Sequence, residues 1–528
     1  MGAVRKPVLM RMMIARMRRC AWLAALTMIA LASCTGAHRS PGTIQVDIEG
    51  SPISTDPRFA TDILSSRINE LVFDALVRID RNGQFVGRLA ESYERPTPTE
   101  LVFHLRHDVH FSDGRPLTAR DVKFTFDSIL APETGTPKRA GLSHLKSVTA
   151  PDDYTVVMTT DGPYAPALEY AMQTIVPDGT PLPARSAAVS PPGAGPFRMA
   201  SFIRDESIVL ERNPYFPAPA EGARNIFLKV VPDPTVRALE LVEGVSDFSE
   251  NNIQPDVLPY LSKQPHLAIS KSPGSSYRYL AFNFRDPYLR DVRVRRAIAY
   301  SVDRASIINS MMRGAARAAT GLLAPENWAY DGDLPIYNYD PARSRQLLDE
   351  AGYPAGPDGM RRLRFVYKTT PEQSSFAQAL QAMFKRVGIV LEIRSNEFAT
   401  FYSDIQKGNF DLTSLNWVGI NDPNHYYMVF DSKMTPPHGM NRGYYSNPEM
   451  DRLVETGART LDLSERKKIY AQVQRLAADD LPYVSLWWDD TVVVMNRELH
   501  GFTPYPNGSL ISLATLTLQG PGAVELSE

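Results

Sequence analysis

Cysteine is almost absent from this sequence. The 528 residues include only two, Cys20 and Cys34, and both lie near the start of the chain. No disulfide framework can therefore hold the remainder together. Burial of apolar side chains must do so instead, and 43% hydrophobic residues in a chain of this length are enough for large cores in more than one domain.

Motifs of common enzymes are absent as well. The sequence has no G-x-S-x-G elbow, no H-E-x-x-H pair and no Walker loop. The run Gly193-Ala194-Gly195 lacks the third glycine of a dinucleotide-binding turn. We therefore expect a protein that is not an enzyme, with no catalytic residues and no cofactor.

An excess of positive charge is missing too. The whole chain has a formal net charge of -2, and residues 1–33 contribute six cations and no acid, so the remainder carries -8. Nothing in that charge balance suggests a surface suited to phosphates. Nucleic acid is therefore excluded as a partner.

A short apolar stretch, Ala21–Ala32, follows a basic start. It is well short of the ~20 residues that a membrane-spanning helix needs, and the layout is typical of a secretory signal peptide. The stretch runs into Ala32-Ser33-Cys34, and two small residues before a cysteine fit a peptidase that cuts after the thiol is acylated. This resembles a bacterial lipoprotein, with a signal peptide over 1–33, lipid on Cys34 and a tether over 34–42. Cleavage elsewhere and an uncleaved anchor are the alternatives.

Alternating and capped segments after the tether predict an α/β fold. Ile44–Ile48 alternates as a half-buried strand, and Leu363–Lys368 and Val390–Ile393 predict strands of a β-α-β succession. Leu101–Arg106 and Val109–Phe111 are predicted to form a hairpin. A side chain that accepts hydrogen bonds before an apolar run predicts where a helix begins. These predicted starts are Thr118, Asp291, Asp303, Asp340, Asn447 and Ser464.

The order of several motifs is similar to that in the solute-binding proteins of the dipeptide, oligopeptide and nickel ABC-importer group. The similarity extends over nearly the whole chain after the tether. The motifs are Leu89–Tyr93, Phe103–Arg106, Val109–Val122, Gly193–Phe197, Arg212–Phe216, Phe282-Asn283, Asp291–Ala297, Ser301–Arg304, Asp340–Tyr353 and Tyr445–Pro448.

The resemblance implies a two-lobed, periplasmic-binding-protein-like α/β fold, with an extra domain in the N-terminal half and two crossing segments that act as a hinge. A ligand would be enclosed when the lobes close. We place the crossings near Gly193–Phe197 and Leu280–Asn283. The expected division is 43–76 for the first part of lobe I, 77–190 for the extra domain, 191–280 for the continuation of lobe I, 281–490 for lobe II and 491–528 for the C-terminal return to lobe I.

The resemblance also implies a function, that of a non-catalytic protein that delivers a solute to an ABC importer. A lipid on Cys34 would keep it at the membrane, in the periplasm or on the cell surface, close to the permease and its ATPases. We expect a monomer whose ligand is a peptide, an oligosaccharide or a similar small solute. An extracytoplasmic hydrolase, and a sensory or chaperone protein without transport, are the alternatives.

The loop Leu415–Asn424 is the expected centre of the ligand site, because it is polar, interrupted by glycine and proline, and carries Trp417 as a stacking face. In peptide-binding members of the family, an aspartate three positions after this tryptophan pairs with the terminal ammonium of the ligand. Ile420 stands there in this chain, and Asp422 could take over the role or only cap the turn before Pro423. Because a buried, unpaired cation is costly, we expect weak binding of free dipeptides and a preference for blocked or longer peptides or oligosaccharides.

The predicted ligand contacts extend beyond this loop. Aromatic side chains near it suit stacking on a flat ligand, and core packing is the alternative for each tyrosine. The predicted ligand-binding residues are Ser54, Thr55, Tyr277, Asn283, Asn416, Trp417, Asn421, Asp422, Asn424 and Tyr426.

Three histidines, His104, His107 and His110, are close enough in sequence to suggest a metal site. They flank the predicted hairpin turn, where strand alternation would not bring them together, so we expect a solvated surface. His425 stands alone beside the Trp417 loop, and one histidine is a poor ligand set. We expect no metal.

Overall fold

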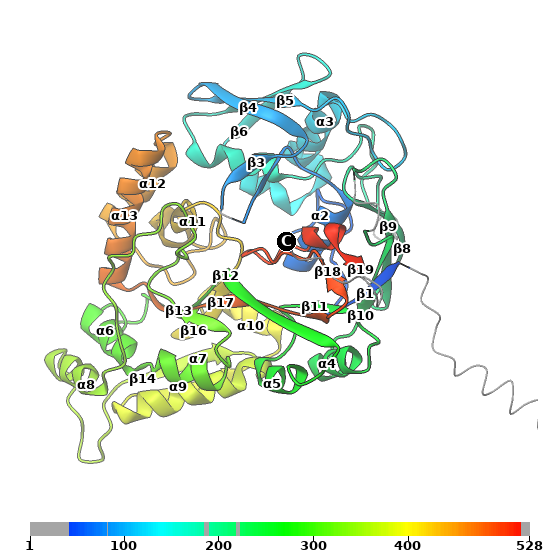
Figure 1. Ribbon diagram of the computed structural model, residues 1–528. Helices are drawn as coiled ribbons and strands as arrows, with labels where there is room; N and C mark the ends of the chain where they lie inside the picture. Colours follow the sequence, from blue (N-terminus) through cyan, green and yellow to red (C-terminus); the bar gives the residue numbers. More distant parts are fainter. Residues whose placement is uncertain (1–41, 82, 184–189, 218–221, 519–528) are drawn as a thin grey trace, which may run out of the picture. The chain divides into compact units, whose positions relative to one another are not determined.

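Two long antiparallel strands, β12 (Leu267–Phe282) and β17 (Tyr483–Asn496), lie in the middle of the main sheet (Figure 1). The computed structural model describes residues 42–81, 83–183, 190–217 and 222–518. The predicted signal peptide, Cys34 and all but the last residue of the predicted tether lie outside these ranges. Within the described ranges, the residues from Ile44 onward form one compact unit. Within the described ranges, every helix is too short or too polar to cross a membrane.

The two long strands join the two halves of this sheet. β12 pairs with β16 at its C-terminal end, and β17 pairs with β11 at its own C-terminal end. Because β12 and β17 are antiparallel, each one extends from one half of the sheet into the other. We call the side with β14, β15 and β16 the β16 half, and the side with β1 and β8 to β11 the β11 half. In order across the sheet, the strands are β15 (Val390–Ser395), β14 (Arg364–Thr369), β16 (Leu412–Trp417), β12, β17, β11 (Phe248–Glu250), β1 (Thr43–Ile48), β10 (Asn225–Val230), β9 (Ser207–Arg212) and β8 (Phe197–Ile203), with β13 (Ala316–Ala318) paired to β17.

The register between β12 and β17 shifts between Ser272 and Ser276, where the chain passes from one half to the other. A Cβ at Gly274 would overlap the carbonyl oxygen of Asp489, so the glycine allows the two backbones to approach closely there. Two irregular, closely packed strands are thus the covalent and hydrogen-bonded link between the halves.

The two predicted crossings lie elsewhere in this arrangement. Leu280–Asn283 includes the last residues of β12, which pair with β16 inside the β16 half. Gly193–Phe197 contacts the end of α2 (Ile63–Val72), where the amide of Gly195 donates to the carbonyl of Val72. Which segments bend during closure stays a prediction.

Helices cover both faces of the β16 half. Side chains alternate along β12, so Leu280 and Phe282 enter a core with α6 to α9, whereas Tyr277 and Tyr279 enter a second core with α11 to α13. The predicted β-α-β succession is confirmed, because β14 and β15 are parallel and α9 joins them. The helices of this half are α6 (Val292–Ser301), α7 (Arg304–Ser310), α8 (Pro341–Glu350), α9 (Ser374–Arg386), α10 (Phe398–Lys407), α11 (His425–Phe430), α12 (Pro448–Arg459) and α13 (Leu463–Asp480).

The β11 half has its own core, and residues between α2 and β8 form a further sheet. Apolar residues of β1, β9, β10 and α2 pack together with Leu510 and Leu513 near the C-terminus. A separate core unites a four-stranded sheet with one helix. The remaining elements are β2 (Val77–Ile79), β3 (Phe85–Gly87), β4 (Ala90–Thr97), β5 (Glu100–Leu105), α3 (Ala119–Leu130), β6 (Leu145–Thr149), β7 (Thr155–Thr160), α4 (Pro234–Val242), α5 (Leu258–Leu261), β18 (Leu499–His500) and β19 (Thr517–Leu518). The predicted α/β class is confirmed.

Local capping explains most of the helix starts. Thr118 and Asp121 form the predicted capping box of α3, and the side chain of Asp291 accepts from the amide of Arg293 at the start of α6. The starts at Asp303, Asp340 and Asn447 are confirmed in the same way. The start at Ser464 was wrong by two residues, since the carboxylate of Asp462 caps α13.

The predicted hairpin of Leu101–Arg106 with Val109–Phe111 is wrong. The first segment forms β5, but β4 pairs with one of its edges and β7 with the other. No edge of β5 is left for a third strand, and His110 makes only an isolated bridge to Pro116. The local turn signal was present, but the pairing partners came from farther along the chain.

Candidate functional site

The sheet topology places loops together at one edge of each half. β14 is parallel to β15 and to β16, so the carboxyl ends of these strands share an edge. The chain passes from β14 to β15 on one side and then returns to β16 on the other, which makes a topological switch point. Ligands of α/β sheets bind in the crevice outside the carboxyl ends at such a point. The Trp417 loop follows β16 there.

The C-terminal part of β16 has an unpaired edge. β16 pairs with β12 along its whole length, but with β14 only at Leu412 and Thr413. From Ser414 to Trp417, the edge that faces away from β12 pairs with no other strand in the part of the chain that the structure describes. Unpaired strand edges present backbone donors and acceptors to an extended ligand. The site can therefore bind an extended main chain.

Trp417 lies within an aromatic cluster. Its indole is 8% exposed and stacks on the ring of Tyr279 with centroids 5.8 Å apart. The guanidinium carbon of Arg442 lies 5.0 Å from the ring centroid, and the His425 ring meets it edge-on. Burial, and secondarily Arg442, lowers the pKa of His425 to about 4, so this imidazole is neutral. The stacking groups around Trp417 come from the protein itself.

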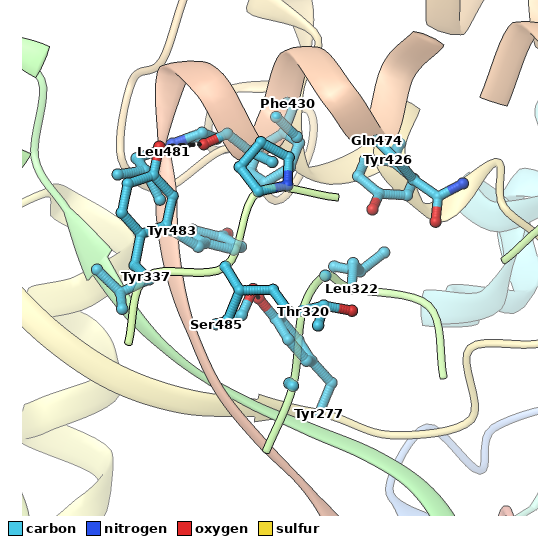
Figure 2. Close-up of a pocket in the computed structure, with 18 of the residues that line it drawn as sticks. Tyr277, Thr320, Leu322, Tyr337, Tyr426, Phe430, Gln474, Leu481, Tyr483 and Ser485 are labelled. Atoms are coloured by element: carbon cyan, nitrogen blue, oxygen red, sulfur yellow. Dashed lines mark hydrogen bonds between the residues drawn. The ribbon is translucent and has the colours of Figure 1, made fainter. Parts of the chain in front are cut away.

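Tyr277 and Tyr426 line an internal cavity of the β16 half (Figure 2). The hydroxyl groups of Tyr277 and Ser485 are 2.7 Å apart, and both tyrosines are at most 2% exposed. The cavity measures about 40 Å³, which is room for water molecules but not for a peptide. Core packing therefore accounts for these two side chains.

Asp422 is held by the protein on both carboxylate oxygens. It is 6% exposed, Arg466 donates to both oxygens, one of these bonds measuring 2.6 Å, and Arg466 is itself 4% exposed. The amide of Asn424 donates to Asp422 Oδ1 at 2.7 Å. The structure therefore shows the turn-capping role that the sequence left open, together with a buried ion pair that links the loop to α13.

The same loop contacts the segment between α2 and β8. Asn424 Nδ2 donates to the hydroxyl of Tyr164 over 3.3 Å, although the two residues are 260 positions apart. Burial, together with Asp422, raises the pKa of Glu169 to about 8, while Arg466 lowers it. The Trp417 loop thus belongs to an interface between distant parts of the chain.

Asn416 belongs to a polar cluster at the crossing that the sequence did not reveal. Its amide donates to Asp489 Oδ2 at 3.1 Å, and so does the hydroxyl of Ser276, also at 3.1 Å. The indole of Trp487 donates to the other carboxylate oxygen at 2.8 Å. Burial raises the pKa of Asp489, and Arg278 and these hydrogen bonds oppose the rise. The cluster ties β16, β12 and β17 together.

Asn421 is brought to a small pocket with Ile420. Ile79, Ser275 and Asn507 also line it, so it draws on the β2–β3 region, the crossing and the C-terminal segment. Its volume is about 40 Å³. The position of the missing aspartate thus faces a place where several segments meet.

Ser54, Thr55 and Asn283 do not line the pocket of Ile420 and Asn421. Ser54 and Thr55 follow β1 and line a different cavity of about 950 Å³ with Ile53. Asn283 lies at the far end of β12, where its amide donates to the carbonyls of Gly408 and Phe410. Their ligand contacts remain predictions.

The histidines predicted to form a solvated surface point to separate neighbours. His107 packs on Tyr154 and His110 on Tyr215. Among the described residues, no group of three His, Cys, Asp or Glu side chains is arranged to hold a metal ion.

Known proteins of similar sequence and structure match most of the chain. The family described as "Bacterial extracellular solute-binding proteins, family 5 Middle" matches residues 84–436. The probable D,D-dipeptide-binding periplasmic protein DdpA of Escherichia coli K12 is 27% identical over 509 residues, which cover 91% of this chain and 96% of DdpA. NikA of Brucella suis, solved with Fe(III)-EDTA, has a TM-score of 0.83 at 24% identity and covers 90% of this chain and 100% of its own. AppA of Bacillus subtilis, solved with a nonapeptide, has a TM-score of 0.77 at 24% identity over 90% of this chain and 99% of its own.

The family match covers more than half of the chain, and its members are non-enzymatic parts of transporters. The hydrolase alternative is therefore set aside. This chain belongs to the bacterial extracellular solute-binding proteins of family 5, and it is the extracytoplasmic solute-binding component of an ABC importer.

Proposed function

We propose that this protein is anchored by lipid on Cys34 and delivers a peptide or a related small solute to an ABC permease and its ATPases by closing its two halves around the ligand. The observation that carries the proposal is the unpaired edge of β16 from Ser414 to Trp417. An extended peptide placed against this edge would gain main-chain hydrogen bonds that depend little on its sequence.

The named ligands of the similar proteins support a peptide-like ligand. DdpA is named for D,D-dipeptides, and AppA was solved with a nonapeptide. NikA, solved with Fe(III)-EDTA, shows that the same fold also holds a metal chelate. The β16 edge favours the peptide-like class for this chain, because a chelate has no main chain to pair with a strand.

We further propose that the ligand needs no N-terminal ammonium at the Trp417 loop. Ile420 occupies the position of the expected carboxylate, and both oxygens of Asp422 are bonded to Arg466. An ammonium buried beside Ile420 would have no anionic partner in this loop, which is costly. Blocked or longer peptides fit this loop better than free dipeptides, and an oligosaccharide is the second ligand class.

Calorimetric titration of the purified protein tests the ligand class. We expect N-acetyl-trialanine to bind at least as tightly as trialanine, and dialanine to bind weakly. Micromolar binding of dialanine that is lost in Asp422→Asn would show that Asp422, and not the β16 edge, sets the specificity. Absence of binding by every peptide, with binding of an oligosaccharide, would overturn the peptide class.

Labelling with palmitate tests the anchor. Cys34→Ala should abolish label incorporation and release the protein from the membrane, whereas Cys20→Ala, the matched change within the predicted signal peptide, should alter neither. Unchanged labelling of Cys34→Ala would contradict lipid attachment at this residue.

A further inference from the structure

Glu250 is the last residue of β11, at the carboxyl end of this strand. β1 and β11 are parallel, with Val46 opposite Phe248, so the loops that follow both strands leave at the same edge. Glu250 also lies opposite Val493 in β17, within the last rungs before the crossing. The amide of the next residue, Asn251, donates to the carbonyl of Val492. The topology thus places the carboxylate beside the link between the two halves.

The side chain of Glu250 is buried. Glu250 is 4% exposed, and neither of its oxygens has a hydrogen-bond partner in the part of the chain that the structure describes. Burial raises its pKa to about 8, with Arg67 opposing and Glu70 adding to the rise. A buried carboxylate is normally hydrogen-bonded or paired, and each exception requires an explanation.

Glu70, whose charge also acts on Glu250, is bound by other groups. Glu70 accepts from the hydroxyl of Ser509 at 2.8 Å and from the amide of Leu510 at 2.7 Å. The guanidinium of Arg67 lies against Gly508, where a Cβ would overlap it. Its charge lowers the pKa of Glu250, but neither oxygen of Glu250 accepts a hydrogen bond from it or from any other described residue. The carboxylate of Glu250 is thus left with full capacity to accept hydrogen bonds.

The group is connected to the pocket at the position of the missing aspartate. Gly508, which contacts Arg67, directly follows Asn507, and Asn507 lines the same pocket as Ile420 and Asn421. Ser275 of β12 lines it as well, within the irregular part of the crossing. The pocket is thus lined by the residue next to the glycine that Arg67 contacts, and the charge of Arg67 acts on Glu250.

We propose that Glu250 binds a cationic group of the ligand, an ammonium or a guanidinium, and so supplies from the β11 half the negative charge that the Trp417 loop lacks. The inference rests on the proposed function, because it names a property of the same ligand. The two oxygens suit a bidentate contact to a cation, and a cation beside them would stabilise the ionised form of a group that burial keeps protonated near neutral pH in the unliganded protein. The cation can be a side chain or a free N-terminus.

Two matched pairs of peptides distinguish these sources. N-acetyl-alanyl-lysyl-alanine is compared with N-acetyl-alanyl-norleucyl-alanine, and trialanine with N-acetyl-trialanine, by calorimetric titration. The variant is Glu250→Gln, which keeps the shape and removes the charge. Glu243→Gln is the control, because Glu243 is an exposed glutamate that follows α4 in the same half.

We expect wild type to bind the lysyl peptide about tenfold or more tightly than the norleucyl peptide, a preference that Glu250→Gln abolishes and Glu243→Gln keeps. A loss of trialanine binding in Glu250→Gln would instead assign the site to a terminal ammonium. Equal binding of the lysyl and norleucyl peptides and of trialanine and its acetylated form, or preferences that survive Glu250→Gln, would overturn the inference and leave the peptide proposal intact. Failure of all four peptides to bind would overturn the proposed peptide class and this ligand assignment together.

Discussion

Two acidic side chains, Asp422 in the β16 half and Glu250 in the β11 half, are buried to nearly the same extent, at 6% and 4% exposure. Asp422 receives hydrogen bonds from Arg466 and from the backbone of its own turn, whereas Glu250 receives none from the described part of the chain. Burial alone therefore does not indicate a role. A carboxylate whose partners are all internal holds the fold, and one without partners is available for an external cation.

The largest expected effect is a loss of stability when the ion pair of Asp422 is broken. Arg466→Ala should lower the free energy of unfolding by about 3–5 kcal/mol, because it leaves Asp422 as an uncompensated buried charge. Urea unfolding at neutral pH measures it. Arg475→Ala on the same helix is the control, since its pairing with Asp331 involves a side chain that is 55% exposed and should contribute under about 1 kcal/mol.

A double variant makes the comparison sharper. Asp422→Leu combined with Arg466→Met removes both charges, so it should be more stable than Arg466→Ala alone. If Arg466→Ala were as stable as Arg475→Ala, the contrast between a structural and an available carboxylate would be lost.

For Glu250, in contrast, removal of the charge should raise the stability of the folded protein. Its pKa in the folded state is raised to about 8, so the folded protein holds a proton that the unfolded chain releases above its own pKa near 4.5. Its contribution to stability therefore falls as pH rises through this window. Glu250→Gln should stabilise the unliganded protein by about 1–3 kcal/mol at about pH 9 and have little effect at about pH 4.

Thermal unfolding across this pH range is the measurement. Arg67 and Glu70 are the charged groups that face Glu250, and neither is changed in the variant. Destabilisation by Glu250→Gln at high pH would indicate that the carboxylate has an internal partner, and would remove the contrast with Asp422.

A substitution of Trp417 tests, with a smaller expected effect, whether this side chain contacts the ligand. Stacking on an aromatic face contributes about 0.5–1.5 kcal/mol, so Trp417→Leu should weaken binding of N-acetyl-trialanine by about tenfold or less. Calorimetry on variant protein with unchanged circular dichroism measures this. Tyr426→Leu, in the same core but beside the water-sized cavity, is the control. Undiminished affinity of Trp417→Leu would exclude a stacking role.

Features set by neighbouring residues were predictable from sequence, and features set by distant ones were not. The caps at Asp291 and Asp340 follow from a side chain and an amide two or three positions away. The Trp417 loop could be predicted as a candidate site because its composition and motif are local. The pairing of Asp422 with Arg466 joins residues 44 positions apart, and no sequence pattern selects that arginine.

Glu250 shows the same limit more strongly. A single glutamate at the end of a short strand carries no motif, and it becomes notable only because β11 pairs with β1 from some 200 positions earlier and with β17 from farther along the chain. The hairpin at Leu101–Phe111 was wrong for the same reason, since β7 occupies the edge that a local partner would need.

The smallest expected effect concerns the contact between the Trp417 loop and the segment between α2 and β8. Tyr164→Phe keeps the ring, which packs on His144 and Tyr170, and removes the hydroxyl that accepts from Asn424. One such hydrogen bond contributes about 0.5–1.5 kcal/mol. If the interface forms only on closure, this bond contributes to the free energy of ligand binding and not to the stability of the unliganded protein. Affinity for N-acetyl-trialanine should therefore fall about threefold to tenfold, while stability without ligand stays nearly constant. Small-angle scattering should show a smaller radius of gyration on ligand addition for wild type, and a higher ligand concentration for the same change in Tyr164→Phe. Equal affinities, with an unchanged radius at saturation, would mean that this contact does not depend on the ligand and that the halves do not close around it.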